Sequence, residues 1–226
     1  MAARALTLWN NAPTRMAIDR AMAKNKGYRL VLTGHSLGGG IANLLQIKQY
    51  FDRQTQSAPI DVRCFGFGSP PSYAAIPTQP IGVLKRIHAA MIKSVSFVIG
   101  NDTIPFLSVD SVRRFLDTLQ KVDDITKGLN IKDRLLIGAG KKAAPPELVD
   151  VVEDGSVDLD PVSGAERLKI AATYVFWLEQ VDGPIFDAVV CKPARLSRLP
   201  ILLKQDMVFD HFPQKYEEGL EGLRVD

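Results

Sequence analysis

A Gly-x-Ser-x-Gly pattern, formed by Gly34, Ser36 and Gly38, is the feature that most constrains the fold of this chain. A short apolar run at residues 30–32 precedes the pattern, and a segment rich in small residues follows it. This order predicts a buried strand, a sharp turn and a helix, with glycines at both flanks because a Cβ atom there would collide with neighbouring backbone. Such a turn exposes the Ser36 hydroxyl and leaves the Leu37 N–H free to bind an oxyanion. We expect Ser36 to be a nucleophile; the alternative is a turn serine that only caps the helix.

Strands and helices alternate along the chain, which predicts one domain over residues 1–226 with a mostly parallel central sheet and flanking helices, an α/β fold. Apolar periodicity places strands at 28–33, 61–67, 94–99 and 171–180, and helices at 14–25, 37–52, 82–93, 110–122 and 209–223. Residues 185–200 are expected to be a variable loop. The segment 143–166 holds seven acidic residues and no Lys or Arg, so we expect a flexible surface loop there, disordered or acting as a lid.

Composition excludes several functional classes. The chain carries 28 basic and 25 acidic residues, a net charge of +3, and no basic stripe with interleaved aromatics, so we expect no nucleic-acid partner. No apolar run approaches the roughly 20 residues of a membrane span. Residues 1–18 lack acids, which fits either a transit peptide or the approach to an amphipathic helix. We therefore expect a cytoplasmic protein or one at a membrane surface.

The two cysteines, Cys64 in a predicted strand and Cys191 in a predicted loop, have no metal-ligand spacing. We interpret them as free thiols. No cluster of metal ligands is present in the sequence, and we expect neither a metal nor a cofactor.

A serine nucleophile needs a base, and the chain has three histidines. His35 precedes the serine in the same turn and cannot fold back on it, so we interpret it as a packed turn residue. His88 falls inside a predicted helix, on a sheet face. His211 follows every predicted strand, at the start of the last helix, as a base carried on a loop should. We favour His211.

The base in turn needs an acid to orient it. Asp102 directly follows the predicted strand 94–99, at the carboxyl end from which ligand-facing residues of parallel sheets emerge. Its alternative role is an Asx-turn ahead of Pro105. Asp110 is the competitor, although its position predicts a helix N-cap. We favour Asp102, which gives the order serine, acid, histidine.

Four motifs in order resemble those of the class 3 (fungal-type) lipases: residues 33–40, 67–71, 100–105 and 210–219. The Asp-His-x-Pro…Tyr…Glu-Gly ending is most similar to the sn-1-specific diacylglycerol lipase branch. The resemblance implies an α/β-hydrolase-like fold and a triad of Ser36, Asp102 and His211. It also implies an acylglycerol or other lipid ester as substrate, with an acyl-enzyme intermediate.

One departure from the family's pattern concerns the second oxyanion donor. The resemblance calls for a loop upstream of the nucleophile strand, and the 35 residues before Ser36 hold no such motif. We therefore expect an N-terminally incomplete domain with an open sheet edge, and losing one oxyanion donor costs about 10²–10³ in rate. The chain is then a piece of a longer lipase, a weakly active short form, or a noncatalytic binding module. An acyltransferase with the same triad is a further alternative.

Lipid contact would come from Ile104–Leu107 or Ile201–Leu203, unless these pack in the core.

Overall fold

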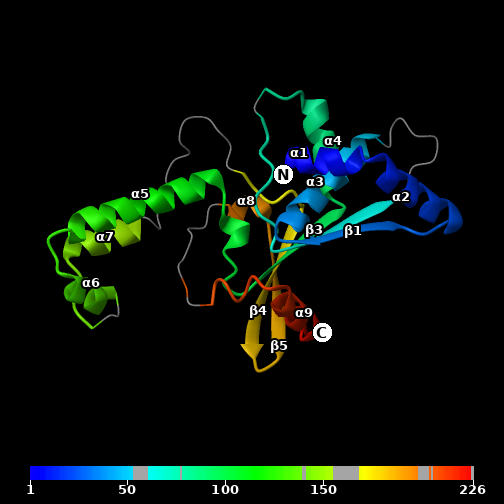
Figure 1. Ribbon diagram of the computed structural model, residues 1–226. Helices are drawn as coiled ribbons and strands as arrows, with labels where there is room; N and C mark the ends of the chain where they lie inside the picture. Colours follow the sequence, from blue (N-terminus) through cyan, green and yellow to red (C-terminus); the bar gives the residue numbers. More distant parts are fainter. Residues whose placement is uncertain are drawn as a thin grey trace.

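A mixed sheet of five strands in the order β1-β2-β3-β4-β5 forms the centre of the molecule. The first four strands run parallel, and β5 is antiparallel to β4 (Figure 1). The computed structural model describes residues 1–52, 61–76, 78–138, 141–154, 168–197, 204 and 206–224. This mostly parallel sheet with flanking helices confirms the expected α/β-hydrolase-like fold.

The elements follow the predicted alternation closely. The strands are β1 Leu30–His35, β2 Val62–Phe67, β3 Ser94–Ile99, β4 Tyr174–Asp182 and β5 Ile185–Cys191. The helices of the sheet layers are α1 Ala2–Trp9, α2 Ala12–Lys24, α3 Leu37–Asp52, α4 Ile81–Met91, α8 Pro193–Leu196 and α9 Pro213–Glu221. A 3-10 turn, η2 Ile104–Phe106, follows β3, and α5 Val109–Thr126, α6 Ile131–Gly138 and α7 Pro146–Asp154 lie between β3 and β4.

Helices α3 and α9 cover opposite faces of the sheet. The amide of Asn43 on α3 bonds to the side chains of Ser96 and Cys64. On α9, a Cβ at Gly219 would meet Ile99 of β3. Ser96 and Ile99 are an odd number of positions apart in β3. Successive side chains of a strand point to opposite faces, so the two helices sandwich the sheet.

Each face has its own apolar core. On the α3 face, Leu45 packs with Ala5 and Trp9 of α1. On the α9 face, the buried core side chains are Ile99, Leu178, Phe186 and Tyr216. Burial of each large apolar side chain stabilises the fold by about 1.5–3 kcal/mol.

Strand register aligns the carboxyl ends of β1, β2 and β3. His35 lies opposite Phe67, and Phe67 lies opposite Phe97. The rings of Phe67, Phe97 and Phe176 stack in a row, with centroids 5.2 and 5.7 Å apart. The loops after these strands therefore emerge at one edge of the sheet, where ligands of parallel sheets bind.

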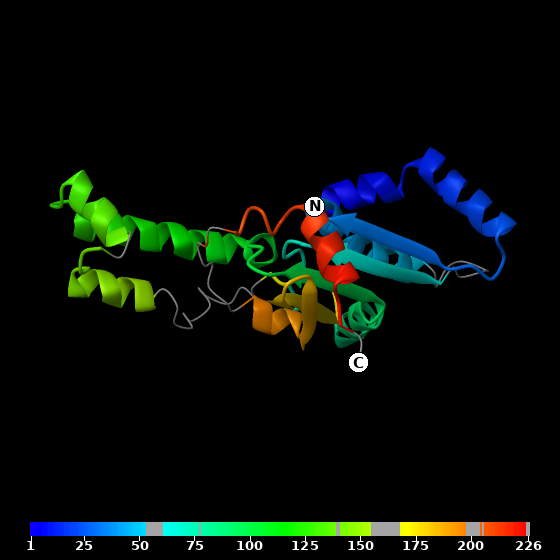
Figure 2. The ribbon, with the colours of Figure 1, turned by 90° about the horizontal axis from the view of Figure 1, so that it is seen from below.

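Helices α5, α6 and α7 form an arm that projects away from the sheet in both views (Figures 1 and 2). Within the arm, α5 packs against α7. No helix among the described residues is long and apolar enough to cross a membrane.

One prediction of irregular structure was wrong, and a second was wrong in part. Residues 185–200 contain β5 and α8, so Cys191 lies in a strand and not in a loop. Part of the acidic segment 143–166 is helical, because α7 begins with a proline at its first position and buries Leu148. Residues 155–166 lie outside the described part of the chain.

Candidate active site

Ser36 has a strained backbone conformation between β1 and α3. Its φ is +55°, and it is the only non-glycine residue with positive φ in the described ranges. Its N–H donates to the carbonyl of Phe67 (2.8 Å), and its carbonyl accepts from the N–H groups of Gly39 and Gly40. Residues other than glycine adopt this conformation only when surrounding structure holds them there, often at functional sites. The strand-to-helix turn is thus a nucleophile elbow in geometry.

The glycines around Ser36 differ in how much space a side chain would have. A Cβ on Gly34 would lie 2.4 Å from the backbone C and O of Gly38, so no larger residue fits. A Cβ on Gly39 would lie 2.4 Å from Ser69 Oγ and 2.8 Å from Gly34 O. A Cβ on Gly38 meets nothing within 4 Å. The prediction that Gly38 is required for lack of space is therefore wrong, and the second close approach is at Gly39.

Asp102 is a completely buried carboxylate just beyond β3. Its Oδ2 accepts hydrogen bonds from His211 Nδ1 (2.9 Å) and from the Tyr216 hydroxyl (2.5 Å). Its Oδ1 accepts one from the N–H of Ile104 (2.9 Å). Burying a charged group is costly unless hydrogen bonds compensate for the lost water, and these three donors do so. The same bonds fix the orientation of the carboxylate.

His211 lies in the turn that precedes α9, rather than in the helix itself. Because the ring bonds to a carboxylate through Nδ1, the proton is assigned to Nδ1 and the lone pair to Nε2. The side chain keeps 21 % of its surface exposed. A histidine oriented in this way can accept a proton at Nε2 and hold it beside Asp102.

His35 lies against His211, with ring centroids 4.6 Å apart. Its Nε2 is 2.6 Å from the backbone carbonyl of His211, so Nε2 carries the proton and donates it. Burial lowers the pKa of His35, which favours the neutral ring. His35 is packed, as expected, but it is the last residue of β1 and not part of the turn. It also holds the backbone of the candidate base, a contact that no sequence pattern indicated.

Two further contacts connect the acid loop with the base loop. Asp210 Oδ2 accepts a hydrogen bond from the N–H of Asn101 (2.7 Å). Gly100, at φ +47°, leaves no space for a Cβ, which would lie 2.5 Å from the same oxygen. Asp210 therefore positions the turn that carries His211. The sequence shows that Asp210 is next to His211, but it does not show that Asp210 bonds to Asn101.

Tyr216 is the other buried group that sequence analysis did not assign. It lies on α9, and burial raises the pKa of its hydroxyl, with the nearby Asp102 charge adding to the effect. The hydroxyl therefore stays protonated and donates to Asp102. Its signal in the sequence is its position five residues after His211, one helical turn into α9.

The structure brings together most of the predicted site residues. Asp102 and His211 are hydrogen-bonded, and Ser36 follows His35, which contacts His211. Ser36 Oγ and the His211 ring, both in the described part of the chain, form no hydrogen bond; in unliganded enzymes this bond is often long and shortens with substrate. Leu37 is the first residue of α3, so its N–H has no acceptor within the helix.

The rejected candidates lie elsewhere. His88 is exposed on α4. Asp110 lies in the first turn of α5, whose N-cap is Ser108 and not Asp110. Of the two apolar segments considered for lipid contact, 201–203 lies outside the described residues, and 104–107 forms η2 and the residue after it, with Pro105 buried.

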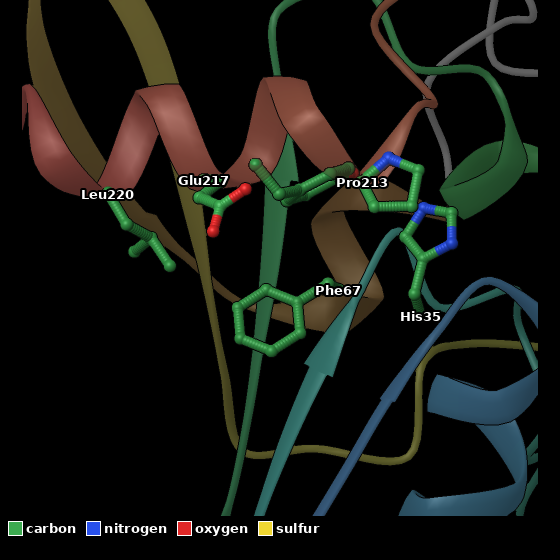
Figure 3. Close-up of a pocket in the computed structure, with 6 residues that line it drawn as sticks. His35, Phe67, Pro213, Glu217 and Leu220 are labelled. Atoms are coloured by element: carbon green, nitrogen blue, oxygen red, sulfur yellow. The ribbon is translucent and has the colours of Figure 1, made fainter.

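A cavity of about 290 Å³ opens beside His35 (Figure 3). Its lining residues are His35, Phe67, Pro213, Tyr216, Glu217 and Leu220. Figure 3 shows His35 near Pro213 at one end and Leu220 toward the other. Its walls are mainly apolar, so the cavity suits hydrocarbon more than a charged group.

Fold and site together define the class: an α/β-hydrolase-like sheet with a strained serine and, at the same edge, a histidine bonded to a buried aspartate. Residues 2–112 match the family model of the class 3 lipases. The matched range contains Ser36 and Asp102 and ends before His211. The match supports hydrolysis of lipid esters in general. The search of the curated proteins finds no match to this chain.

Proposed function

We propose that this protein is a serine carboxylic-ester hydrolase that acts on acylglycerol lipids, with Ser36 as nucleophile, His211 as base and Asp102 as the orienting acid. The observation that carries the proposal is the backbone of Ser36. Its positive φ is imposed at the carboxyl edge of the sheet where His211 is bonded to Asp102. A capping serine needs neither this strain nor a neighbouring histidine–carboxylate pair.

The proposed reaction proceeds in two halves. Ser36 Oγ attacks the ester carbonyl carbon and its proton passes to His211 Nε2, while the carbonyl oxygen becomes an oxyanion near the Leu37 N–H. The intermediate collapses, the bond to the alcohol oxygen breaks, and His211 returns the proton to that oxygen. Water then attacks the acyl-enzyme with His211 as base, and Ser36 and a fatty acid are released. Asp102 stabilises the imidazolium in both halves.

Diacylglycerol is the substrate we propose within this class. The support is the resemblance of residues 210–219 to the diacylglycerol lipase branch and the apolar cavity beside His35 and Tyr216. Comparing hydrolysis of mono-, di- and triacylglycerols with the same acyl chain tests this finer assignment. Diacylglycerol should be hydrolysed fastest, and faster turnover of triacylglycerol would contradict it.

The variant Ser36→Ala tests the reaction itself. We expect the wild-type chain to hydrolyse p-nitrophenyl butyrate and to be labelled by a fluorophosphonate probe at Ser36. In Ser36→Ala, labelling should be lost and turnover should fall by at least about 10³-fold, the scale on which nucleophile removal acts in serine hydrolases. Ser197→Ala, a half-buried serine after α8, is the matched control and should retain both. A folded wild-type chain that neither reacts with the probe nor hydrolyses the ester would refute the proposal.

A further inference from the structure

The far end of the arm exposes an apolar helix face. On α6, Ile131 is 77 % exposed and Leu135 is 69 % exposed. The two lie four residues apart and so share one face of the helix. In both views α6 lies at the end of the arm away from the sheet (Figures 1 and 2). Two exposed aliphatic side chains on one face of a projecting helix form a small apolar patch that another surface can cover.

Basic residues flank this face in the sequence. Between residues 127 and 142 the sequence has five Lys or Arg and one Asp. Lys127, Lys132 and Lys141 are exposed, while Lys142 bonds to Asp133 (2.8 Å) and Arg134 bonds to Asp123 (3.1 Å). Apart from Asp133, the described acidic side chains of the arm lie on α5 and α7: Asp117, Asp123, Asp124, Glu147 and Asp150. We name residues 127–137 and 141–142 the basic tip.

We propose that the basic tip docks on an anionic phospholipid surface. Ile131 and Leu135 would enter the headgroup region, and the lysines would contact lipid phosphates and carboxylates. Apolar residues flanked by Lys are typical of segments that lie in a membrane interface, and each Lys near an anionic surface adds about 1 kcal/mol of binding. Lysine is depleted at protein–protein interfaces, which favours lipid over an acidic protein as the partner.

The position of the arm gives this docking a consequence. Helix α5 begins at Val109, a few residues after Asp102, so the arm leaves the sheet at the edge that carries the candidate active site. A docked tip would keep that edge close to the lipid. This consequence rests on the proposed ester hydrolysis, but docking itself needs no turnover and is measured separately.

Co-sedimentation of the intact chain with vesicles tests the proposal. We compare vesicles of phosphatidylcholine alone with vesicles containing about one third phosphatidylserine, at low and high salt. The wild-type chain should bind the anionic vesicles and be released by salt. The triple variant Lys127→Gln/Lys132→Gln/Lys141→Gln should bind at least about tenfold more weakly, and Ile131→Ser/Leu135→Ser should also lose binding.

Matched controls change the same residue types elsewhere on the surface. They are Lys24→Gln/Lys26→Gln/Lys85→Gln, and Ile81→Ser/Ile92→Ser at the two ends of α4, where the side chains are 69 % and 61 % exposed. Both controls should bind like wild type, and all variants should keep wild-type turnover of soluble p-nitrophenyl butyrate. Equal binding to neutral and anionic vesicles, unchanged binding by the tip variants, or binding to polyglutamate but not to vesicles would overturn the proposal.

Discussion

Single residues decide how closely the acid and base loops approach, and Gly68 is the clearest example. It has φ +56°, and a Cβ there would lie 2.7 Å from Asp102 Oδ2, 3.0 Å from the Tyr216 hydroxyl and 3.1 Å from His211 Cε1. Gly68→Ala should therefore displace the Asp102 carboxylate from the His211 ring. We expect ester hydrolysis to fall by at least about 10²-fold, because small displacements of catalytic groups cost that much.

The matched control is Gly183→Ala, at φ +49° in the β4–β5 turn, where a Cβ meets nothing within 4 Å. In both variants the left-handed backbone conformation lowers the free energy of unfolding by about 1–2 kcal/mol, which thermal unfolding measures. Gly183→Ala should lose this stability and keep its activity. Equal activity loss in both variants would show that backbone strain, and not crowding at Asp102, explains the effect.

At the level of elements, the nucleophile elbow predicts opposite effects on stability for substitutions of Gly34 and Gly38, the two glycines that flank Ser36. Gly38→Ala introduces a methyl group into open space within α3, and alanine favours helix over glycine by about 1 kcal/mol. We expect this variant to remain folded and to be slightly more stable. Gly34→Ala drives a Cβ into the Gly38 backbone and should prevent the turn from forming. Expression yield, circular dichroism and fluorophosphonate labelling check both; an unfolded Gly38→Ala protein would contradict the open-space geometry.

The ion pairs at the amino ends of β1, β2 and β3 predict how stability depends on pH. Asp61, just before β2, bonds to Lys93 (2.5 Å) and Arg29 (2.7 Å), the residues ahead of β3 and β1. Above all the hydrogen bond from Lys93, supported by that from Arg29, lowers the pKa of Asp61 to about 2. A lowered carboxyl pKa stabilises the fold fully above about pH 4, the unfolded value, and this stabilisation disappears as pH falls through about 2.

Asp61→Asn should therefore lower the free energy of unfolding at pH 7, by no more than about 1 kcal/mol because the side chain is 37 % exposed. Near pH 2 the variant and the wild type should unfold alike. Asp19→Asn, an exposed residue of α2, should change little at either pH. A deficit of Asp61→Asn that persists at pH 2 would contradict the ion-pair explanation.

The sequence predicted elements well where periodicity and burial coincide. β3 begins and ends at the predicted residues because its buried and half-buried positions alternate. β5 was missed because Val189 and Val190 are both about half exposed, so this edge strand lacks the alternation that identifies a strand. In the candidate site, Asp102 and His211 follow from their places after predicted elements. Tyr216, 114 residues from Asp102, becomes a partner only through tertiary packing of α9.

For the molecule as a whole, the arm and the sheet differ in how much apolar surface they bury. Strands β2 and β3 alternate buried side chains such as Val62, Cys64 and Val98. In the described part of the arm, Leu148 is the only buried large apolar side chain. Segments with few buried contacts open locally at a lower free energy than the core. We therefore expect α6 to open independently of global unfolding.

Native-state hydrogen exchange measures this difference. Amides of α6 should exchange at least about 100-fold faster than those of β2 after correction for intrinsic rates. Added anionic vesicles should slow exchange in α6 and leave β2 unchanged, since only the basic tip is proposed to touch lipid. Amides of α6 as protected as those of β2 in the free protein would mean that the arm unfolds with the sheet. The arm would then be part of the cooperative core, despite the exposure of Ile131 and Leu135.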